Sequence, residues 1–213
     1  MITIHHLSTS RSERIVWLAE ELGIPYRMQW HQREANGAAP AALREVHALG
    51  KAPVIEDDGL VLAESGAIVE YIVQRHGGGR LAVKPDAPEY ADYLYWMHFA
   101  EGSLMTLMLI ALVLSRVPEA KDGPVRKRIA KRLDDMLAYV DAKIAGHEYF
   151  AGNHFTAADI MMSFPFTTMK RYLDYDLSSH DHIRAWLGRM EARPAYARAM
   201  ALAGPDAARK DAA

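Results

Sequence analysis

Hydroxyl side chains are concentrated near the start of the chain, directly before a segment with helical spacing. Ser8, Thr9, Ser10 and Ser12 stand together there. A hydroxyl in such a turn can donate a hydrogen bond to a bound anion, and the positive end of the following helix favours negative charge. The same residue types also cap helices. The stretch by itself therefore predicts either an anion site or one capping hydroxyl with solvated neighbours.

Two further segments contain groups that could hold a small peptide-like ligand. In Gly50–Val54 a proline directly precedes a strand, and a cis bond there would free the Ala52 backbone to pair with an extended peptide. Glu64 and Ser65 begin a later helix, where amides and a hydroxyl suit a carboxylate and Glu64 suits an ammonium group. Each segment also has an ordinary structural interpretation. Only the combination with the hydroxyl stretch favours a ligand site.

Composition limits the chemistry that these groups could serve. The 213 residues include no cysteine, so any thiol chemistry must act on a thiol that a ligand brings. A net charge of −2 argues against nucleic acid or an anionic membrane as a partner. The basic residues of 121–132 fit a solvated helix face. His180-Asp181-His182 has no third ligand nearby, so we expect no metal.

The first third of the chain alternates strand and helix patterns, and these elements must position the three segments. The expected elements, in order, are a strand at Ile2–His6, a helix ended by Gly23, a strand over Tyr26–Trp30, a short helix over Ala38–Val46, a hairpin around Asp57-Asp58-Gly59 and a helix that ends before Gly77. The predicted order is βαβαββα.

A change of pattern separates this region from the rest of the chain. Residues 77–88 contain three glycines and two prolines, a composition typical of an exposed connection. After Glu89 only helical spacing recurs. We therefore predict an α/β domain over residues 1–78, a linker over 79–88 and an all-α domain over 89–213.

Two features of the second domain bear on its surroundings and its folding. Leu104–Leu114 is apolar but shorter than the roughly 20 residues of a membrane span, so it predicts a buried helix. With no secretory leader visible, we expect a cytoplasmic protein that makes no membrane contact. Thr156 and Asp159, three residues apart before an apolar run, predict a capping box.

Taken together and in this order, the segments resemble the glutathione S-transferase family over nearly the whole chain. The resemblance is carried by SRSERIVWLAEELGIPY at Ser10–Tyr26, GKAPVIEDDG at Gly50–Gly59, AESGAIVEYI at Ala63–Ile72 and FTAADI at Phe155–Ile160. It implies a thioredoxin-like N-terminal domain that binds glutathione, and an all-α C-terminal domain with an electrophile pocket and dimer contacts. It also implies that the protein is a homodimer.

The resemblance further implies a serine that faces the glutathione sulfur. Ser10 lies four residues before Arg14, the spacing found in serine-type members of the family. Ser8 and Thr9 stay as rivals, because Arg11 follows Ser10 and the proline often found two places after that serine is absent. The absence of cysteine excludes the branches that use a protein thiol.

Other residues match the family's binding positions. The implied glutathione-binding residues are Lys51, Ala52, Pro53, Glu64 and Ser65. The candidate walls of the electrophile pocket are Met97, Leu104, Met105, Met108 and Tyr172, residues whose spacing also fits a helical core. Glu101 is a candidate contact across the dimer.

The implied reaction is attack by the glutathione thiolate on a small hydrophobic electrophile, with glutathione as co-substrate and no metal. An unperturbed thiol has a pKa of about 8.5 and is mostly protonated at neutral pH, so the protein must stabilise the thiolate. Lowering that pKa by about two units needs roughly 2.7 kcal/mol, which a hydroxyl donor and a helix terminus can supply together. A glutathione-dependent peroxidase side activity is compatible with the family. The alternative is a non-enzymatic binding or regulatory protein with the same groove.

Overall fold

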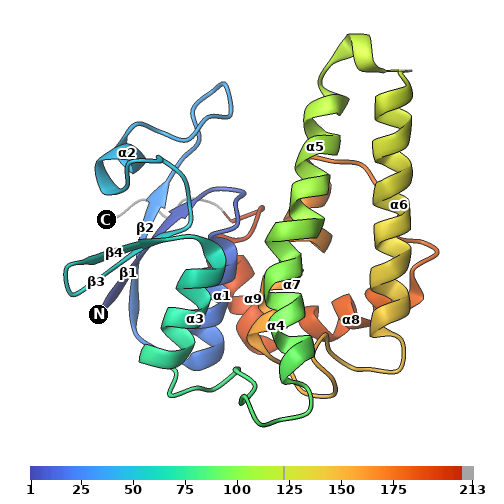
Figure 1. The fold of residues 1–213 in the computed structure, drawn as a ribbon. Helices are drawn as coiled ribbons and strands as arrows, with labels where there is room; N and C mark the ends of the chain where they lie inside the picture. The colour runs from blue at the N-terminus through green and yellow to red at the C-terminus, as the bar shows by residue number, and fades with distance from the viewer. Residues whose placement is uncertain (122, 208–213) are drawn as a thin grey trace. The chain divides into compact units, whose positions relative to one another are not determined.

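A four-stranded sheet forms the centre of the first unit of the computed structural model, which describes residues 1–121 and 123–207 (Figure 1). The strands are β1 (Ile2–Leu7), β2 (Tyr26–His31), β3 (Val54–Asp57) and β4 (Leu60–Ala63), in the order β2-β1-β3-β4. β1 pairs parallel with β2 and antiparallel with β3, while β3 and β4 form the Asp-Gly hairpin. β1 lies inside the sheet, which explains why nearly all of its residues are buried. The unit is an α/β, thioredoxin-like domain, as the sequence predicted.

Helices cover this sheet, and two of them begin at the predicted ligand segments. They are α1 (Glu13–Leu22), α2 (Ala42–Val46), α3 (Ser65–Arg75) and, from the far end of the chain, α9 (Pro194–Ala203). α1 buries an apolar face that includes Trp17 and ends at Gly23, whose φ of 62° favours glycine. α1 and α3 pack against each other (Figure 1). The predicted order βαβαββα is confirmed.

A buried carboxylate ties α3 to the hairpin. Asp57 Oδ2 accepts hydrogen bonds from Tyr71 Oη at 2.9 Å and from His76 Nε2 at 2.6 Å. Burial disfavours the ionised form of Asp57, but these two bonds outweigh burial and hold its pKa below the ordinary value. Because the hairpin and α3 are joined in this way, the residues between them, Glu64 and Ser65, are held at a fixed place.

The C-terminal helix packs with the first unit rather than with the other helices. The sequence placed all of residues 89–213 in the second domain, whereas in the structure Met1–Ala82 and the segment from Glu191 form one compact unit and Val83–Met190 the other. Glu21 on α1 accepts two hydrogen bonds from Arg193, at 2.7 and 2.8 Å, and Trp17 contacts Tyr196 edge-on. Helical spacing identifies α9 as a helix, but it cannot identify the unit against which that helix packs.

Among the described residues of the second unit, all regular secondary structure is helical, apart from one isolated bridge between Tyr149 and Gly152. Its elements are α4 (Tyr90–Phe99), the π-helical turn η1 (Ala100–Met105), α5 (Thr106–Ser115), the 3-10 turn η2 (Pro118–Ala120), α6 (Pro124–Ile144), α7 (Ala157–Phe166), the 3-10 turn η3 (Thr168–Arg171) and α8 (Asp181–Glu191). This confirms the predicted all-α class of the region.

The predicted capping box is present at the start of α7 and extends into the core. Asp159 is fully buried and its carboxylate accepts from the Thr156 amide at 2.9 Å and the Thr156 hydroxyl at 3.2 Å. Its other oxygen accepts from the Phe150 amide at 3.0 Å and from Trp186 Nε1 at 2.9 Å. Burial raises the pKa of Asp159 to about 6, and the four donors oppose that rise. One carboxylate thus joins α7, α8 and the loop before α7.

The long apolar helix is only partly buried. It runs without a break from Tyr90 to Ser115 and is long and apolar enough to cross a membrane, a test that core helices of water-soluble proteins also pass. Met108 is buried on its inner side, but Ile110 is 44% exposed and Val113 is 62% exposed. The prediction of a buried helix is therefore wrong for the outer face of α5, because the sequence could not show how few elements cover it.

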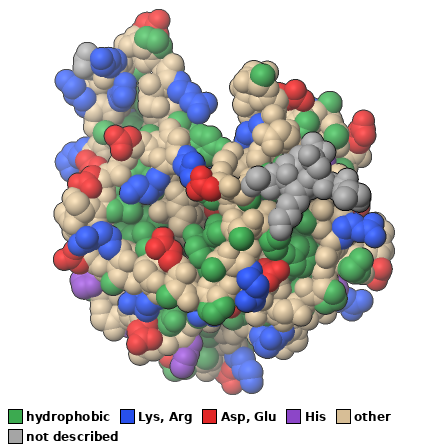
Figure 2. Space-filling view, turned by 180° about the vertical axis from the view of Figure 1, so that it is seen from behind, with side chains coloured by type: hydrophobic (Ala, Val, Ile, Leu, Met, Phe, Trp, Pro, Cys, Tyr) green, Lys and Arg blue, Asp and Glu red, His purple; other side chains and the backbone are tan. Residues whose placement is uncertain are grey.

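Charged side chains are mixed over the surface. On the face shown in Figure 2, Lys and Arg side chains lie interspersed with Asp and Glu. This distribution agrees with the net charge of −2 for the whole sequence. A partner recognised by a large field of one sign is not indicated on that face.

Candidate functional site

Strand register brings the three candidate segments to the same end of the sheet. His5 of β1 pairs with Val54, and Val54 pairs in turn with Ala63 of β4. Continuing both registers by one residue sets Pro53 beside the end of β1 and beside Glu64. The Ser10 turn follows directly after β1. Segments far apart in the sequence therefore lie at the same end of the sheet.

The Ser10 hydroxyl is nearly buried and already has partners inside the protein. Ser10 is 6% exposed, and its Oγ lies 2.7 Å from Ser12 Oγ and accepts from the Ser12 amide at 3.3 Å. Ser12 occupies the N-cap position of α1, but its side chain makes no capping bond. It accepts instead from the Leu7 amide at 3.1 Å. The interpretation of the stretch as one ordinary cap with solvated neighbours is therefore wrong.

The positive end of α1 acts on the Ser10 turn mainly through its dipole. The amides of Glu13 and Arg14, in the first turn, donate to the carbonyls of Ser10 and Arg11, each at 3.2 Å. These amides are therefore not free to bind an anion. The helix macrodipole still favours negative charge beside the turn.

Local contacts distinguish Ser10 from one of its rivals. The Thr9 hydroxyl donates to the Ser8 carbonyl at 2.8 Å, and Thr9 has a positive φ of 48°. Arg33 donates from Nε to the Ser8 carbonyl at 3.0 Å and from Nη2 to the Thr9 carbonyl at 3.2 Å. This turn is thus held by hydrogen bonds in a conformation that costs about 1–3 kcal/mol for a residue with a side chain. The Thr9 hydroxyl serves the turn, which favours Ser10 as the hydroxyl that meets a ligand.

The second segment has the conformation considered from the sequence. The Ala52–Pro53 peptide bond is cis. The β3 ladder begins at Val54, so the Ala52 backbone has no strand partner among the described residues. Pro53 is buried, Ala52 is half-buried and Lys51 is exposed. An extended peptide could pair with the backbone of Ala52, just before the start of β3.

The third segment combines backbone strain with an exposed acid. Glu64 has a φ of 76°, which is rare for a residue with a side chain, and its side chain is exposed. Ser65 is buried in the first turn of α3. The first amides of α3 have no partner within the helix and suit a carboxylate, while Glu64 suits an ammonium group. Strain of this kind is typical of ligand sites.

The candidate residues of the second unit are mostly buried. Met97, Leu104, Met105 and Met108 are each 2% exposed or less, and Tyr172 is half-buried. Glu101 is half-buried on η1. The electrophile pocket and the cross-dimer contact stay predictions.

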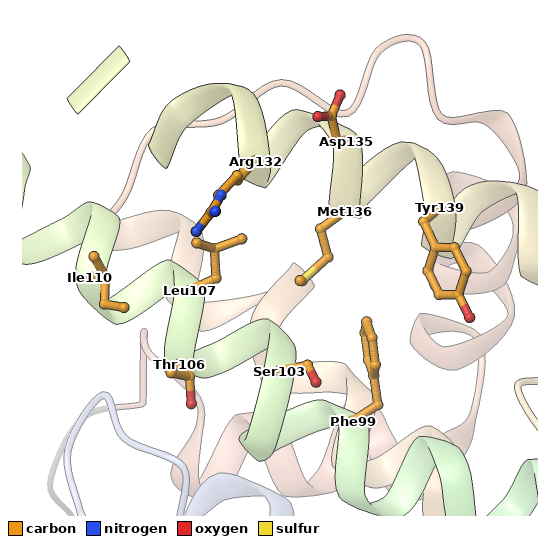
Figure 3. A pocket seen from close by; sticks show the side chains of 9 residues that line it. All are labelled: Phe99, Ser103, Thr106, Leu107, Ile110, Arg132, Asp135, Met136 and Tyr139. Atoms are coloured by element: carbon orange, nitrogen blue, oxygen red, sulfur yellow. The ribbon is translucent and has the colours of Figure 1, made fainter. Parts of the chain in front are cut away.

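A groove of about 470 Å³ lies elsewhere in the second unit, between α5 and α6 (Figure 3). Its apolar lining includes Leu107 of α5 and Met136 of α6. Two charged residues of α6, Arg132 and Asp135, also line it. None of the predicted pocket walls lines this groove. The sequence did not predict it, because α6 carries many charged residues and its pattern predicts a solvated face.

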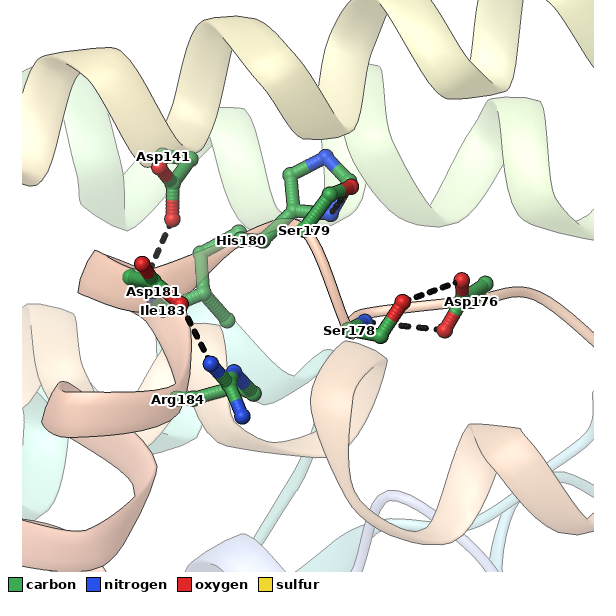
Figure 4. A network of polar contacts seen from close by, with 8 residues as sticks. All are labelled: Asp141, Asp176, Ser178, Ser179, His180, Asp181, Ile183 and Arg184. Atoms are coloured by element: carbon green, nitrogen blue, oxygen red, sulfur yellow. Dashed lines mark hydrogen bonds and ion pairs between the residues drawn. The ribbon is translucent and has the colours of Figure 1, made fainter.

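Two residues of His180-Asp181-His182, the segment for which the sequence predicted no metal, make other contacts. Figure 4 shows Asp181 paired with Arg184, while the Ser179 hydroxyl lies 3.4 Å from His180 Nδ1. In the same view Asp141 of α6 accepts a hydrogen bond from the Ile183 amide at 2.9 Å and thereby caps α8. Among residues 1–121 and 123–207, no group of three or more His, Asp or Glu side chains could hold a metal ion.

Sequence reasoning did not predict that Ser12 and His6 support Ser10. Ser12 and His6 are both fully buried, and Ser12 Oγ lies 2.9 Å from His6 Nδ1. The histidine pair His5-His6 inside a strand was the available signal, because a buried imidazole needs a hydrogen-bonding partner.

Comparisons with known proteins agree on one family. The model of the glutathione S-transferase N-terminal domain matches residues 10–75, and that of the C-terminal domain matches residues 104–194. Glutathione S-transferase 3 of Schizosaccharomyces pombe is 38% identical over 92% of this chain and 85% of its own length. Glutathione S-transferase 1 of Saccharomyces cerevisiae is 28% identical over 92% of this chain and 93% of its own length.

Solved structures give the same result. A glutathione S-transferase from Actinobacillus pleuropneumoniae superposes with a TM-score of 0.87 at 32% identity, covering 97% of this chain and 95% of that one. A theta class glutathione S-transferase from Xanthomonas axonopodis pv. citri, solved with glutathione bound, has a TM-score of 0.74 at 28% identity and covers 95% and 98%. The chain therefore belongs to the glutathione S-transferase family of enzymes.

Proposed function

We propose that this protein joins the sulfur of glutathione to a small hydrophobic electrophile, with the Ser10 hydroxyl donating a hydrogen bond to the sulfur. The proposal rests on the strand register, which brings Pro53, Glu64 and the turn that contains Ser10 to the same end of the sheet. That end of the sheet offers the Ser10 hydroxyl, the backbone of Ala52, which lies outside the β3 ladder, and the start of α3. Glutathione offers a thiol, a peptide backbone and a γ-glutamyl zwitterion. The relative from Xanthomonas axonopodis pv. citri, solved with glutathione bound, supports this assignment.

Each part of the ligand has a counterpart in the first unit. Glu64 would receive the γ-glutamyl ammonium group, and Ser65 with the first amides of α3 would receive its carboxylate. The cysteinyl unit would pair with the backbone of Ala52, and Lys51 would bind a carboxylate of the same ligand. These contacts hold the sulfur in place and do not themselves take part in the reaction.

The chemical step is a nucleophilic displacement. The bound thiol loses its proton to solvent, and the thiolate attacks the electrophilic carbon. A carbon–sulfur bond forms, and a halide or similar group leaves with the bonding electrons. Ser10 favours this step because the hydrogen bond that it donates stabilises charge on the sulfur. Met97, Leu104, Met105, Met108 and Tyr172 remain the proposed walls for the electrophile.

A conjugation assay tests this function. With glutathione and a chlorinated nitrobenzene, the wild-type chain should form the thioether far faster than the same mixture without protein. Product formation that is no faster with protein than without it, despite saturable binding of glutathione, would favour the non-enzymatic alternative.

We also propose that the protein is a homodimer that covers the outer face of α5. Ile110 and Val113 are exposed there, beside the groove between α5 and α6. Exposed apolar area of this kind marks an interaction site. The groove carries Arg132 and Asp135 as well as apolar side chains, a mixture that suits a protein surface better than a lipid.

Sedimentation measures this association directly. The wild type should sediment at twice the 23.8 kDa of one chain, and Ile110→Glu should sediment as a single chain. Leu49→Glu is the matched control, because Leu49 is 55% exposed in the first unit and should stay dimeric as a glutamate. A wild-type chain that is monomeric at micromolar concentration contradicts the proposal.

A further inference from the structure

A chain of buried polar groups runs from Ser10 into the protein. Ser10 Oγ lies 2.7 Å from Ser12 Oγ, which lies 2.9 Å from His6 Nδ1. Ser12 and His6 are fully buried, and Ser10 is 6% exposed. The His6 ring also packs against Trp30, with 4.6 Å between the ring centroids. The imidazole is therefore held in one place, and the three groups must share their protons among themselves.

The hydrogen-bonding capacity of Ser12 limits how these protons are arranged. A hydroxyl has one proton and two acceptor positions. The Leu7 amide, at 3.1 Å, can only donate, so it takes one acceptor position. If the Ser12 proton went to the Leu7 carbonyl, at 3.3 Å, one of the two shorter contacts, to Ser10 or to His6, would have no proton between its atoms. Two arrangements remain: His6 donates to Ser12 and Ser12 donates to Ser10, or the direction is reversed and Ser10 donates inward.

The other nitrogen of His6 distinguishes the two arrangements. His6 Nε2 is buried and has no hydrogen-bond partner among the described residues. If Ser12 donated to Nδ1, Nε2 would carry a buried proton with no acceptor, and orphaned N–H groups are rarer than under-satisfied acceptors. Burial, with a smaller contribution from His31, lowers the pKa of His6 to about 4, so near neutral pH the ring carries only one proton. That proton belongs on Nδ1, facing Ser12.

The consequence for Ser10 follows from the same counting. Ser10 Oγ then accepts from the Ser12 hydroxyl and from the Ser12 amide, which fills both of its acceptor positions. Its own proton is the only capacity that is left, and it has no acceptor inside this network. Ser10 can therefore serve a ligand only as a donor.

We infer that Ser12 and His6 are positioning residues that orient the Ser10 hydroxyl outward, as a hydrogen-bond donor to the sulfur of glutathione. This inference rests on the proposed function, because it takes the sulfur as the ligand of Ser10. Neither Ser12 nor His6 touches the ligand. The Ser12 hydroxyl and the Ser12 amide both donate to Ser10 Oγ and occupy its two acceptor positions. The Ser10 proton therefore stays directed at the sulfur when the thiolate forms.

Two substitutions at His6 test the direction of the chain. His6→Leu removes the donor to Ser12, whereas the side-chain amide of His6→Asn can keep an N–H group near the position of Nδ1. The thiol pKa of bound glutathione is read from the ultraviolet absorbance of the thiolate as pH is raised. In His6→Leu we expect this pKa to rise by about half a unit to one unit, and the conjugation rate below it to fall about three- to tenfold. Glutathione affinity should stay within a factor of two, and His6→Asn should match the wild type.

Each other outcome overturns the inference. A thiol pKa that falls in His6→Leu means that Ser10 donates inward in the wild type. An unchanged thiol pKa, or equal losses in His6→Leu and His6→Asn, means that His6 only supports the fold. Ser12→Ala removes the middle link and carries the same test if His6→Leu does not fold. If the wild type itself leaves the bound thiol at its free value, the proposed function fails, independently of His6.

Discussion

Replacing Ser10 with alanine should lower the rate of conjugation about 10- to 100-fold below the thiol pKa of the wild-type complex, while glutathione affinity changes only a few fold. A hydrogen bond to a charged group contributes about 1.5–3 kcal/mol, and about 1.4 kcal/mol corresponds to one pKa unit, so the bound thiol should become one to two units less acidic. Most of the proposed binding contacts lie at Glu64, Ser65 and Ala52, which the change leaves in place. The measurement is the pH profile of conjugation to a chlorinated nitrobenzene.

The shape of that profile separates a lost hydrogen bond from a damaged site. At high pH the thiol ionises without help, so Ser10→Ala should approach the wild-type rate there. Ser8→Ala is the matched control, because Ser8 belongs to the same turn and should behave as the wild type. Turnover that is unchanged in Ser10→Ala would transfer the role to Ser8, to Thr9 or to a bound water.

Replacing Asp159 with alanine should cost about 4 kcal/mol of unfolding free energy, the largest stability effect that we expect from a single change. The carboxylate satisfies the Phe150 amide, the Thr156 amide and hydroxyl, and Trp186 Nε1, all in the core. Each buried donor left without a partner costs about 1–3 kcal/mol, although the losses do not simply add. Since domains are commonly stable by about 5–15 kcal/mol, the variant should be close to unfolding at physiological temperature.

Urea denaturation at neutral pH measures this loss. Asp141→Ala is the control, because the half-buried Asp141 caps α8 through a single bond to Ile183 and its loss should cost about 1 kcal/mol. If the two variants are equally stable, the network around Asp159 contributes no more than an ordinary cap, and our account of the α7 start is wrong.

The sequence predicted the bounds of several elements well, because local chemistry determines them. The Asp-Gly turn sets the hairpin, Gly23 ends α1, and Thr156 with Asp159 sets the start of α7. Each of these signals acts within a few residues. The order of the elements followed from spacing, whereas the thioredoxin-like fold followed from the family resemblance.

What the sequence could not predict depends on contacts between distant segments. The packing of α9 on α1 through Glu21 and Arg193 joins residues 172 positions apart. The exposed face of α5 depends on which helices are absent beside it. The partners of Ser12 lie on β1 and in the Ser10 turn, and a hydroxyl before a helix predicts a cap unless the strand behind it is known. Sequence reasoning therefore identified the residue proposed to meet the ligand but did not predict the hydrogen bonds that join it to Ser12 and His6.

Calorimetric titration of the wild-type chain with glutathione tests the central claim most directly. The account predicts a saturable heat with one glutathione bound per chain. Cysteinylglycine, which lacks the γ-glutamyl group proposed to bind at Glu64 and Ser65, should give no saturable heat under the same conditions. If millimolar glutathione produces neither heat nor a change in Tm, this ligand does not bind at the end of the sheet near Ser10, Pro53 and Glu64. The proposed function is then wrong.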